Sequence, residues 1–126
     1  MVKEPVVSTL LVIEDEPQVR TLVGAMLEAA GYHVLTAASG AEGLCLLNDQ
    51  AIDLILVDIF MPGMDGLELI KRLRNTCPTS KIIAMSGGTT QWNYLDVATH
   101  LGAHATLQKP FSRQELLDVV RARLET

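Results

Sequence analysis

The sequence is poor in aromatic residues and carries an excess of acidic over basic charge, and both features exclude classes of protein. Of its 126 residues 4% are aromatic while 48% are hydrophobic, so we expect a sizeable core built from aliphatic side chains. The formal net charge of −5 argues against a direct nucleic-acid or anionic-membrane partner, because both need a basic surface. A cation or a basic protein surface suits this chain better.

Cysteine is also scarce, and no hydrophobic run is long enough to span a membrane. Cys45 and Cys77 have neither metal-site spacing nor nearby histidines, so we expect reduced structural thiols in a reducing compartment. The N-terminal segment, with Glu4 and Pro5, does not have the pattern of a signal peptide. We therefore expect a cytoplasmic protein with a single domain over residues 1–126.

Short apolar runs alternate with stretches of helical periodicity along the whole chain. The runs at residues 6–13, 33–36, 54–57, 82–85 and 104–108 have the length and composition of strands. The residues expected at helix starts are Pro17, the pairs Ser39/Glu42 and Ser112/Glu115, Asp65, and Thr89 or Thr90, with Gly31 and Gly102 at helix ends. Leu22 and Cys45 fall on apolar positions of their helices.

This alternation predicts an α/β fold, with a five-stranded parallel sheet, right-handed crossovers and five helices distributed over both faces. The nearly unbroken apolar character of the first run is typical of a strand covered on both sides. Because parallel strands point the same way, their C-terminal tips share one edge. Ligands bind beyond that edge, where the strand order switches direction.

Chemically useful side chains stand at the ends of four predicted strands: Glu14 and Asp15, then Asp58, Ser86 and Lys109. Taken alone, Asp58 is equally well read as a turn residue. If the strand order is 2-1-3-4-5, however, Asp15 and Asp58 are neighbours. Carboxylates about 4 Å apart repel by roughly 4 kcal/mol at an effective dielectric of about 20, and a divalent cation reverses the sign. Oxygen ligands without a calcium-loop motif favour Mg²⁺.

With a cation in place, one carboxylate of such a cluster can attack a phosphoryl group and form an aspartyl phosphate. Phosphoryl transfer needs mainly positioning and neutralisation of the equatorial oxygens. Mg²⁺, the Lys109 ammonium and the Ser86 hydroxyl could supply both. Gly87 and Gly88 leave room for the phosphate.

Together these residues resemble a response regulator receiver domain of two-component signalling, along essentially the whole chain. The resemblance rests on the pair Glu14-Asp15, on Asp58 within VDIFMPGMDG, on Ser86 within MSGG and on Lys109 within KPF. It implies a flavodoxin-like receiver fold with strand order 2-1-3-4-5. It also implies a signalling domain that assists its own phosphorylation and dephosphorylation, not an enzyme acting on other substrates.

The resemblance further implies that Asp58 accepts the phosphoryl group from a phosphohistidine of a sensor histidine kinase or histidine phosphotransfer protein. Asp15, Asp58 and the backbone carbonyl of Phe60 would hold Mg²⁺, with Glu14 assisting through water. Ser86 and Lys109 would grip the phosphoryl oxygens, and the peptide between Lys109 and Pro110 would be cis.

One position departs from the pattern, because receivers commonly carry Tyr or Phe where this chain has Thr106. Ser86 provides the hydroxyl of the usual switch, but the aromatic partner that turns inward is missing. The main expectation is that phosphorylation changes the binding of a downstream protein at the face made by the fourth helix, fifth strand and fifth helix. The alternative is a receiver-like interaction module that works without phosphorylation. A magnesium-dependent phosphatase is a weaker reading, since no acidic residue lies two positions after Asp58.

Several other residues receive simpler interpretations. We expect His33, His100 and His104 to be structural, and Glu16 to be a solvated carboxylate or cap. Trp92 and Tyr94 are expected to be core or ordinary surface unless exposed, in which case they would suit partner contacts. Phe60 is large and apolar, and we hypothesise that it hinders the water that hydrolyses the acyl phosphate. Both a stand-alone receiver and a part of a larger regulator or hybrid kinase fit the sequence.

Overall fold

The computed structural model describes residues 7–61, 64–87 and 92–125. Its main sheet is parallel and contains β1 (Thr9–Ile13), β2 (His33–Ala37), β3 (Leu54–Asp58), β6 (Lys81–Gly87) and β7 (Ala105–Lys109). The strand order is β2-β1-β3-β6-β7, which confirms the predicted 2-1-3-4-5 arrangement of the five long strands. The first and third long strands are therefore neighbours at the switch point.

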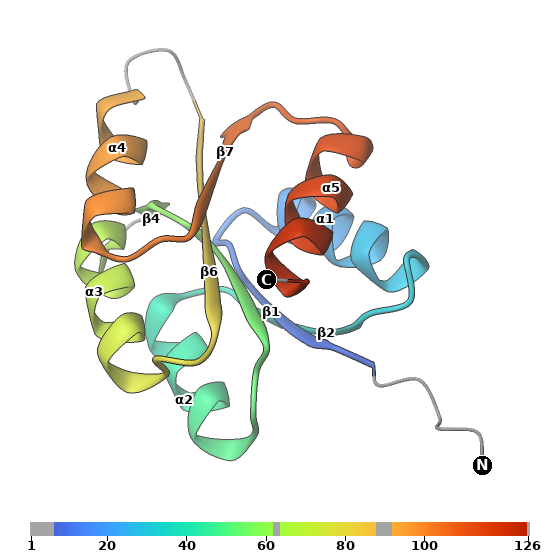
Figure 1. Ribbon diagram of the computed structural model, residues 1–126, viewed down its shortest axis with the longest axis horizontal. Coiled ribbons are helices and arrows are strands. Elements are labelled where there is room, and N and C mark those ends of the chain that lie inside the picture. The colour runs from blue at the N-terminus through green and yellow to red at the C-terminus, as the bar shows by residue number, and fades with distance from the viewer. Residues whose placement is uncertain (1–6, 62–63, 88–91, 126) are drawn as a thin grey trace.

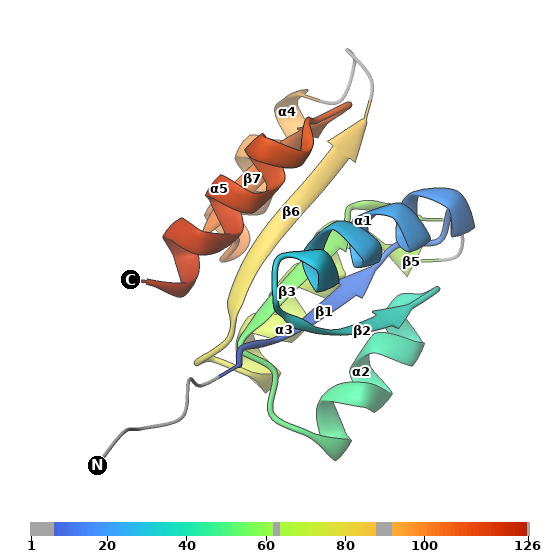
Figure 2. The same cartoon turned by 90° about the vertical axis from the view of Figure 1, so that its right-hand side faces the viewer.

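Within the described residues, five helices cover the two faces of this sheet (Figures 1 and 2). They are α1 (Pro17–Ala29), α2 (Gly40–Asp49), α3 (Gly66–Thr76), α4 (Trp92–Leu101) and α5 (Arg113–Leu124). Helices α1 and α5 pack on one face, and α2, α3 and α4 pack on the other. None of the helices in the described part of the chain combines the length and apolarity that a membrane span requires.

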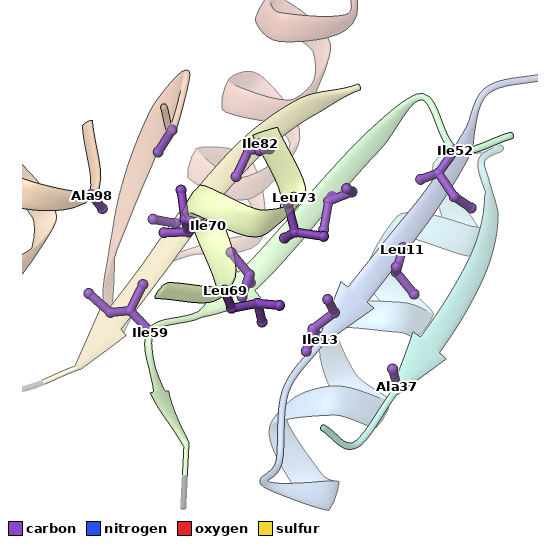
Figure 3. Packing of buried hydrophobic residues seen from close by; sticks show 14 residues of the cluster. Leu11, Ile13, Ala37, Ile52, Ile59, Leu69, Ile70, Leu73, Ile82 and Ala98 are labelled. Carbon is purple, nitrogen blue, oxygen red and sulfur yellow. The ribbon is translucent and has the colours of Figure 1, made fainter. Parts of the chain in front are cut away.

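Alternate residues of β1, β3 and β6 point into two separate hydrophobic clusters. On β1, Leu11 and Ile13 face α2 and α3, whereas Leu10 and Val12 face α1 and α5. Figure 3 shows the first cluster, in which Leu69, Ile70 and Leu73 of α3 cover the strands. Among the residues that the structure describes, the buried hydrophobic side chains are aliphatic or methionine, as the composition predicts.

Most of the predicted helix ends are confirmed. Pro17 begins α1, and Gly31 and Gly102 follow α1 and α4 with φ of 101° and 127°, where glycine is free of the strain that a side chain would bring. Ser112 and Glu115 form a reciprocal capping box at the start of α5. The pair Ser39/Glu42, also predicted as a capping box, is only half formed. The Ser39 hydroxyl accepts the Glu42 N–H, but the Glu42 carboxylate accepts the N–H of Ala38 and not that of Ser39.

Other sequence predictions need correction. The first strand begins at Thr9, because its neighbours β2 and β3 offer no earlier ladder partners, and Val7 is exposed. Leu22 is 56% exposed and Cys45 is exposed, although both occupy apolar positions of their helices. A small antiparallel pair, β4 (Phe60–Met61) and β5 (Met64–Asp65), was not predicted.

Three predicted roles fall where the structure describes too little to test them. Asp65 lies in β5 directly before α3, but its side chain is outside the described part, so its role as a cap stays a prediction. Thr89 and Thr90 lie outside the described residues altogether. The side chains of Trp92 and Tyr94, at the start of α4, are also outside the description.

Gly66 is packed directly against the backbone that leaves the sheet after β3. A Cβ atom at this position would overlap the Cα, C and O atoms of Ile59, which are backbone atoms and cannot move aside alone. We expect Gly66→Ala to destabilise the protein by about 1–3 kcal/mol, as overpacking usually does. Urea unfolding followed by circular dichroism measures this loss.

Gly24 of α1 provides a matched control for this substitution. A Cβ at Gly24 would lie 3.5 Å from the Thr36 methyl group, which is an ordinary contact. Gly24→Ala should therefore leave stability unchanged or raise it by about 0.4–1 kcal/mol. Equal effects of the two substitutions would show that the close approach of Gly66 to Ile59 does not restrict position 66.

His104 is structural, as predicted, because it links β6 to the start of β7. Its Nδ1 accepts the backbone N–H of Ile82 at 3.0 Å, and the backbone N–H of His104 donates to the carbonyl of Ile82 at 2.7 Å. An imidazole that accepts at Nδ1 must be unprotonated there. Burial, together with the charges of Arg74, Lys81 and Arg123, lowers the pKa of His104 from its usual value of 6.5.

This arrangement predicts an acid-dependent loss of stability. Below about pH 6.5 the His104 side chain is protonated in the unfolded chain but still neutral in the folded chain. The free energy of unfolding therefore falls as the pH decreases, until the pH reaches the lowered pKa of the folded state. His104→Asn keeps an acceptor oxygen without a titrating ring and should flatten that part of the pH profile in urea unfolding. Exposed His33→Asn is the control and should keep the wild-type slope. Identical slopes for all three proteins would contradict the assignment.

Candidate functional site

The C-terminal edge of the sheet brings together polar side chains from distant parts of the chain. Glu14 directly follows β1, and Asp58 and Lys109 are the last residues of β3 and β7. Ligand oxygens of Glu14, Asp15 and Asp58 all lie within 4.8 Å of one another. Asp15 and Asp58 are therefore adjacent, as the strand order predicted.

Lys109 joins this acidic cluster from the other side. Its Nζ lies 2.8 Å from Oε2 of Glu14 and 3.4 Å from Oδ2 of Asp58. The Lys109 side chain is 22% exposed, whereas those of Glu14 and Asp58 are 1% and 7% exposed. The peptide bond between Lys109 and Pro110 is cis, as expected.

Ser86 lies closer to the interior than the sequence suggested. It is inside β6 rather than after it, it is buried, and it directly follows Met85, the residue that pairs with Asp58. Ser86 thus stands at the same edge of the sheet. Thr106, which was expected to share in the switch, is the second residue of β7, lies opposite Ala84 and lines a separate hollow of about 500 Å³ between α4, β7 and α5.

The mouth of the site is an open hollow of about 430 Å³. Glu14, Asp58, Phe60, Gly87 and Lys109 line it, together with Glu16 and Val19. The Phe60 N–H donates to Oδ1 of Asp58 at 3.1 Å, and the Phe60 residue is 38% exposed. The hydrogen bond fixes one carboxylate oxygen of Asp58, so that the other, Oδ2, faces Lys109.

Burial and mutual repulsion disfavour the charged form of the carboxylates in this cluster. Burial raises the pKa of Glu14, the charge of Asp58 raises it further, and the hydrogen bond from Lys109 opposes both. Three carboxylates against one ammonium leave an excess of negative charge. The sequence analysis predicted this repulsion between neighbouring carboxylates, and a bound cation would neutralise the excess negative charge.

The donor set fits Mg²⁺. All three grouped side chains offer carboxylate oxygens, which suit a hard cation, and the adjoining hollow is open to solvent. Mg²⁺ keeps several waters when few protein oxygens hold it, so three carboxylates at an open edge match its preference. The ion would neutralise charge on a bound phosphoryl group and orient it.

One residue of the site was missed by sequence reasoning. Arg20, in α1, places Nη1 at 2.9 Å from the backbone oxygen of Glu14 and 3.4 Å from that of Asp15. The available signal was a cation near the N-terminus of a helix, where the helix dipole disfavours positive charge. That signal does not reveal which groups Arg20 contacts, because the carbonyls of Glu14 and Asp15 come within reach of its side chain only through the turn between β1 and α1.

Comparisons with known proteins agree with this picture. The family model for the response regulator receiver domain matches residues 10–121. The transcriptional regulatory protein AfsQ1 of Streptomyces coelicolor is 38% identical over 116 residues, which cover 90% of this chain and 50% of AfsQ1. GlrR of Escherichia coli is 35% identical over 118 residues, which cover 92% of this chain and 26% of GlrR. The chain thus spans between about a quarter and a half of these regulators.

Solved structures give the same result. The receiver domain of NtrX from Brucella abortus superimposes with a TM-score of 0.89 at 31% identity, covering 93% of this chain and 98% of that one. A response regulator receiver domain protein from Methanospirillum hungatei gives a TM-score of 0.88 at 28% identity, with 95% of each chain covered. Both similarities extend over nearly the whole chain.

Proposed function

Because this chain belongs to the family of response regulator receiver domains, we propose that it is a phosphoacceptor switch in which Asp58 receives a phosphoryl group from a phosphohistidine. The donor would be a sensor histidine kinase or a histidine phosphotransfer protein. The observation that carries the proposal is the meeting of Glu14, Asp15 and Asp58 within 4.8 Å beside the Lys109 ammonium.

The contacts of Asp58 support different tasks for its two carboxylate oxygens in this proposal. Oδ1 is occupied by the Phe60 N–H, which fixes the rotation of the carboxylate, whereas Oδ2 lies 3.4 Å from Lys109. Oδ2 is therefore the oxygen that attacks phosphorus. A bond forms between Oδ2 and phosphorus while the bond from phosphorus to the donor imidazole nitrogen breaks, and the histidine keeps that electron pair.

The remaining residues hold the charges in place during transfer. Asp15 and Asp58, with the backbone carbonyl of Phe60, would hold Mg²⁺, and Glu14 would assist through a water. The 2.8 Å pair with Glu14 keeps the Lys109 ammonium at the site before phosphate arrives. Lys109 and the Ser86 hydroxyl then donate to the phosphoryl oxygens as negative charge accumulates there.

A phosphorus–nitrogen donor tests this function without knowledge of the natural kinase. Phosphoramidate and Mg²⁺ should add one phosphoryl group to the wild-type chain, detected by intact mass, because its P–N bond resembles that of phosphohistidine. Asp58→Asn should gain none, because the amide lacks the nucleophilic carboxylate. Equal modification of both proteins would exclude Asp58 as the acceptor.

Phe60 is expected to prolong the life of the phosphoryl group. Its partly exposed ring lies at the mouth of the hollow, where it restricts the approach of the water that hydrolyses the acyl phosphate. Phe60→Asn should shorten the lifetime roughly ten-fold, which corresponds to about 1.4 kcal/mol of activation free energy. Phe60→Leu keeps an apolar side chain and serves as the control. An unchanged lifetime in Phe60→Asn would reject the hypothesis.

The output of the switch would be a change in binding at the surface formed by α4, β7 and α5. Phosphorylation must favour one arrangement of this surface, and about 5.5 kcal/mol is needed to move a 1:99 mixture to 99:1. Since Thr106 replaces an aromatic side chain, the alternative of a phosphate-independent interaction module has a specific basis. Binding of a downstream protein to Asp58→Asn as tightly as to the phosphorylated wild type would favour that alternative.

A further inference from the structure

Arg20 contacts the backbone on both sides of Asp15. Its Nη1 donates to the carbonyl oxygen of Glu14 at 2.9 Å, and the carbonyl oxygen of Asp15 lies 3.4 Å away. These carbonyls belong to the two peptide groups that flank the Cα atom of Asp15. The orientation of those two planes defines φ and ψ of Asp15, and with them the direction of its side chain.

A second contact holds the same corner from inside the site. The Glu16 backbone nitrogen lies 3.4 Å from Oε1 of Glu14, while Oε2 of the same carboxylate accepts a hydrogen bond from Nζ of Lys109. The peptide group between Asp15 and Glu16 is thus held at its carbonyl by Arg20 and at its N–H by Glu14. The corner that presents Asp15 is consequently tied to both α1 and β7.

The location of Arg20 argues against a role in helix stability. It is the fourth residue of α1, near the N-terminus, where the helix dipole repels a cation by about 0.3–1 kcal/mol. A positive charge near a cation site also weakens binding of the cation by repulsion. What Arg20 contributes is one guanidinium nitrogen, Nη1, that contacts two adjacent carbonyls at once.

We propose that Arg20 is a positioning residue for the metal site: it holds the corner between β1 and α1 so that the Asp15 carboxylate faces Glu14 and Asp58. Arg20 then strengthens Mg²⁺ binding without touching the ion, in the way that outer-shell residues orient metal ligands. The inference rests on the proposed function, because it takes Mg²⁺ as the ion of this site.

Three variants separate geometry from charge. Arg20→Met keeps the approximate length and removes both the donors and the charge. Arg20→Lys keeps the charge but replaces the guanidinium by an ammonium on a shorter side chain. Arg72→Met removes the same charge from an exposed position of α3. Mg²⁺ affinity is measured by calorimetry, and the rate of phosphorylation by phosphoramidate is measured as a function of Mg²⁺. Thermal unfolding in EDTA reports the stability of each variant.

Arg20→Met should weaken Mg²⁺ binding by roughly 10- to 100-fold and raise the half-saturating Mg²⁺ concentration by the same factor. The maximal rate at saturating Mg²⁺ should remain near the wild-type value, because the ion then reorders the corner. Arg20→Lys should be intermediate, and Arg72→Met should match the wild type. If Arg20→Met does not stay folded, Arg20→Lys must still show the weaker binding.

Unchanged Mg²⁺ affinity in the folded Arg20 variants would overturn this inference, even if they unfold at a lower temperature. Tighter binding in Arg20→Met would overturn it too, because that result shows a simple repulsion by the guanidinium. In both cases the proposed function survives, since the wild type still binds the ion. Absence of Mg²⁺ binding by the wild type would overturn the proposed function and this inference together.

Discussion

Lys109→Met is expected to slow phosphorylation of Asp58 by roughly 10²- to 10³-fold, the loss typical for one electrostatic stabiliser of a transition state. The reason is that the ammonium, 3.4 Å from Oδ2 of Asp58, lies where the transferred phosphoryl group must accumulate charge. Methionine preserves the length of the side chain and part of its packing but offers no positive charge. The measurement is the initial rate with phosphoramidate at saturating Mg²⁺.

Lys109→Met should also tighten Mg²⁺ binding, although it slows phosphorylation. A substitution that only disturbed folding would weaken both, so these opposite effects identify a role of the Lys109 charge. Lys109 pairs with Glu14 at 2.8 Å, so ammonium and metal ion compete for the same carboxylates. Since Lys109 also opposes the raised pKa of Glu14, its removal raises that pKa further. Calorimetry is therefore best done on the alkaline side of neutrality, where proton competition is weakest.

Lys71→Met, at an exposed position of α3, is the control for net charge. Weaker Mg²⁺ binding in Lys109→Met would contradict this account.

Asp15→Asn is expected to abolish most Mg²⁺ binding. A unit charge about 4 Å from a dication contributes roughly 8 kcal/mol of attraction at an effective dielectric of about 20, although only part of it survives as net affinity. The loss should therefore exceed the roughly 10- to 100-fold typical of outer-shell substitutions. Phosphorylation at low Mg²⁺ should fall in parallel, which intact mass over a Mg²⁺ series will measure.

Glu16→Gln is the matched control for Asp15→Asn. Glu16 is the next residue in the chain and carries the same charge, but its side chain is exposed and is not among the three carboxylates that lie within 4.8 Å of one another. It should retain Mg²⁺ binding close to that of the wild type. If the two variants lose affinity equally, the ion responds to the general negative potential of the corner and not to Asp15 as a ligand.

The sequence was sufficient to predict the fold and the meeting of the acidic side chains with Lys109 at one edge of the sheet, because both follow from the pattern of apolar runs. Apolar runs that end on Asp58 or Lys109 identify strands and also tell which residues reach the shared edge. The sequence failed where a contact depends on the packing of neighbours. Periodicity places Leu22 on the apolar side of α1 but does not say that the rest of the fold leaves it 56% exposed.

Backbone geometry was the second limit of prediction. The β4 and β5 strands are two residues each, too short to show any alternation. The requirement for glycine at position 66 comes from the approach of the Ile59 backbone, and the role of Arg20 comes from the turn between β1 and α1. Both contacts join a residue to main-chain atoms, and the sequence does not reveal which main-chain atoms the fold brings beside it.

The most direct test of the account is to determine which side chain carries the phosphoryl group after incubation with acetyl phosphate, with and without Mg²⁺, by mass-spectrometric peptide mapping. The carboxylate cluster predicts one modified residue, Asp58, and modification only when Mg²⁺ is present. Phosphoryl transfer to a residue other than Asp58, or equally fast transfer to Asp58 in EDTA, would contradict it.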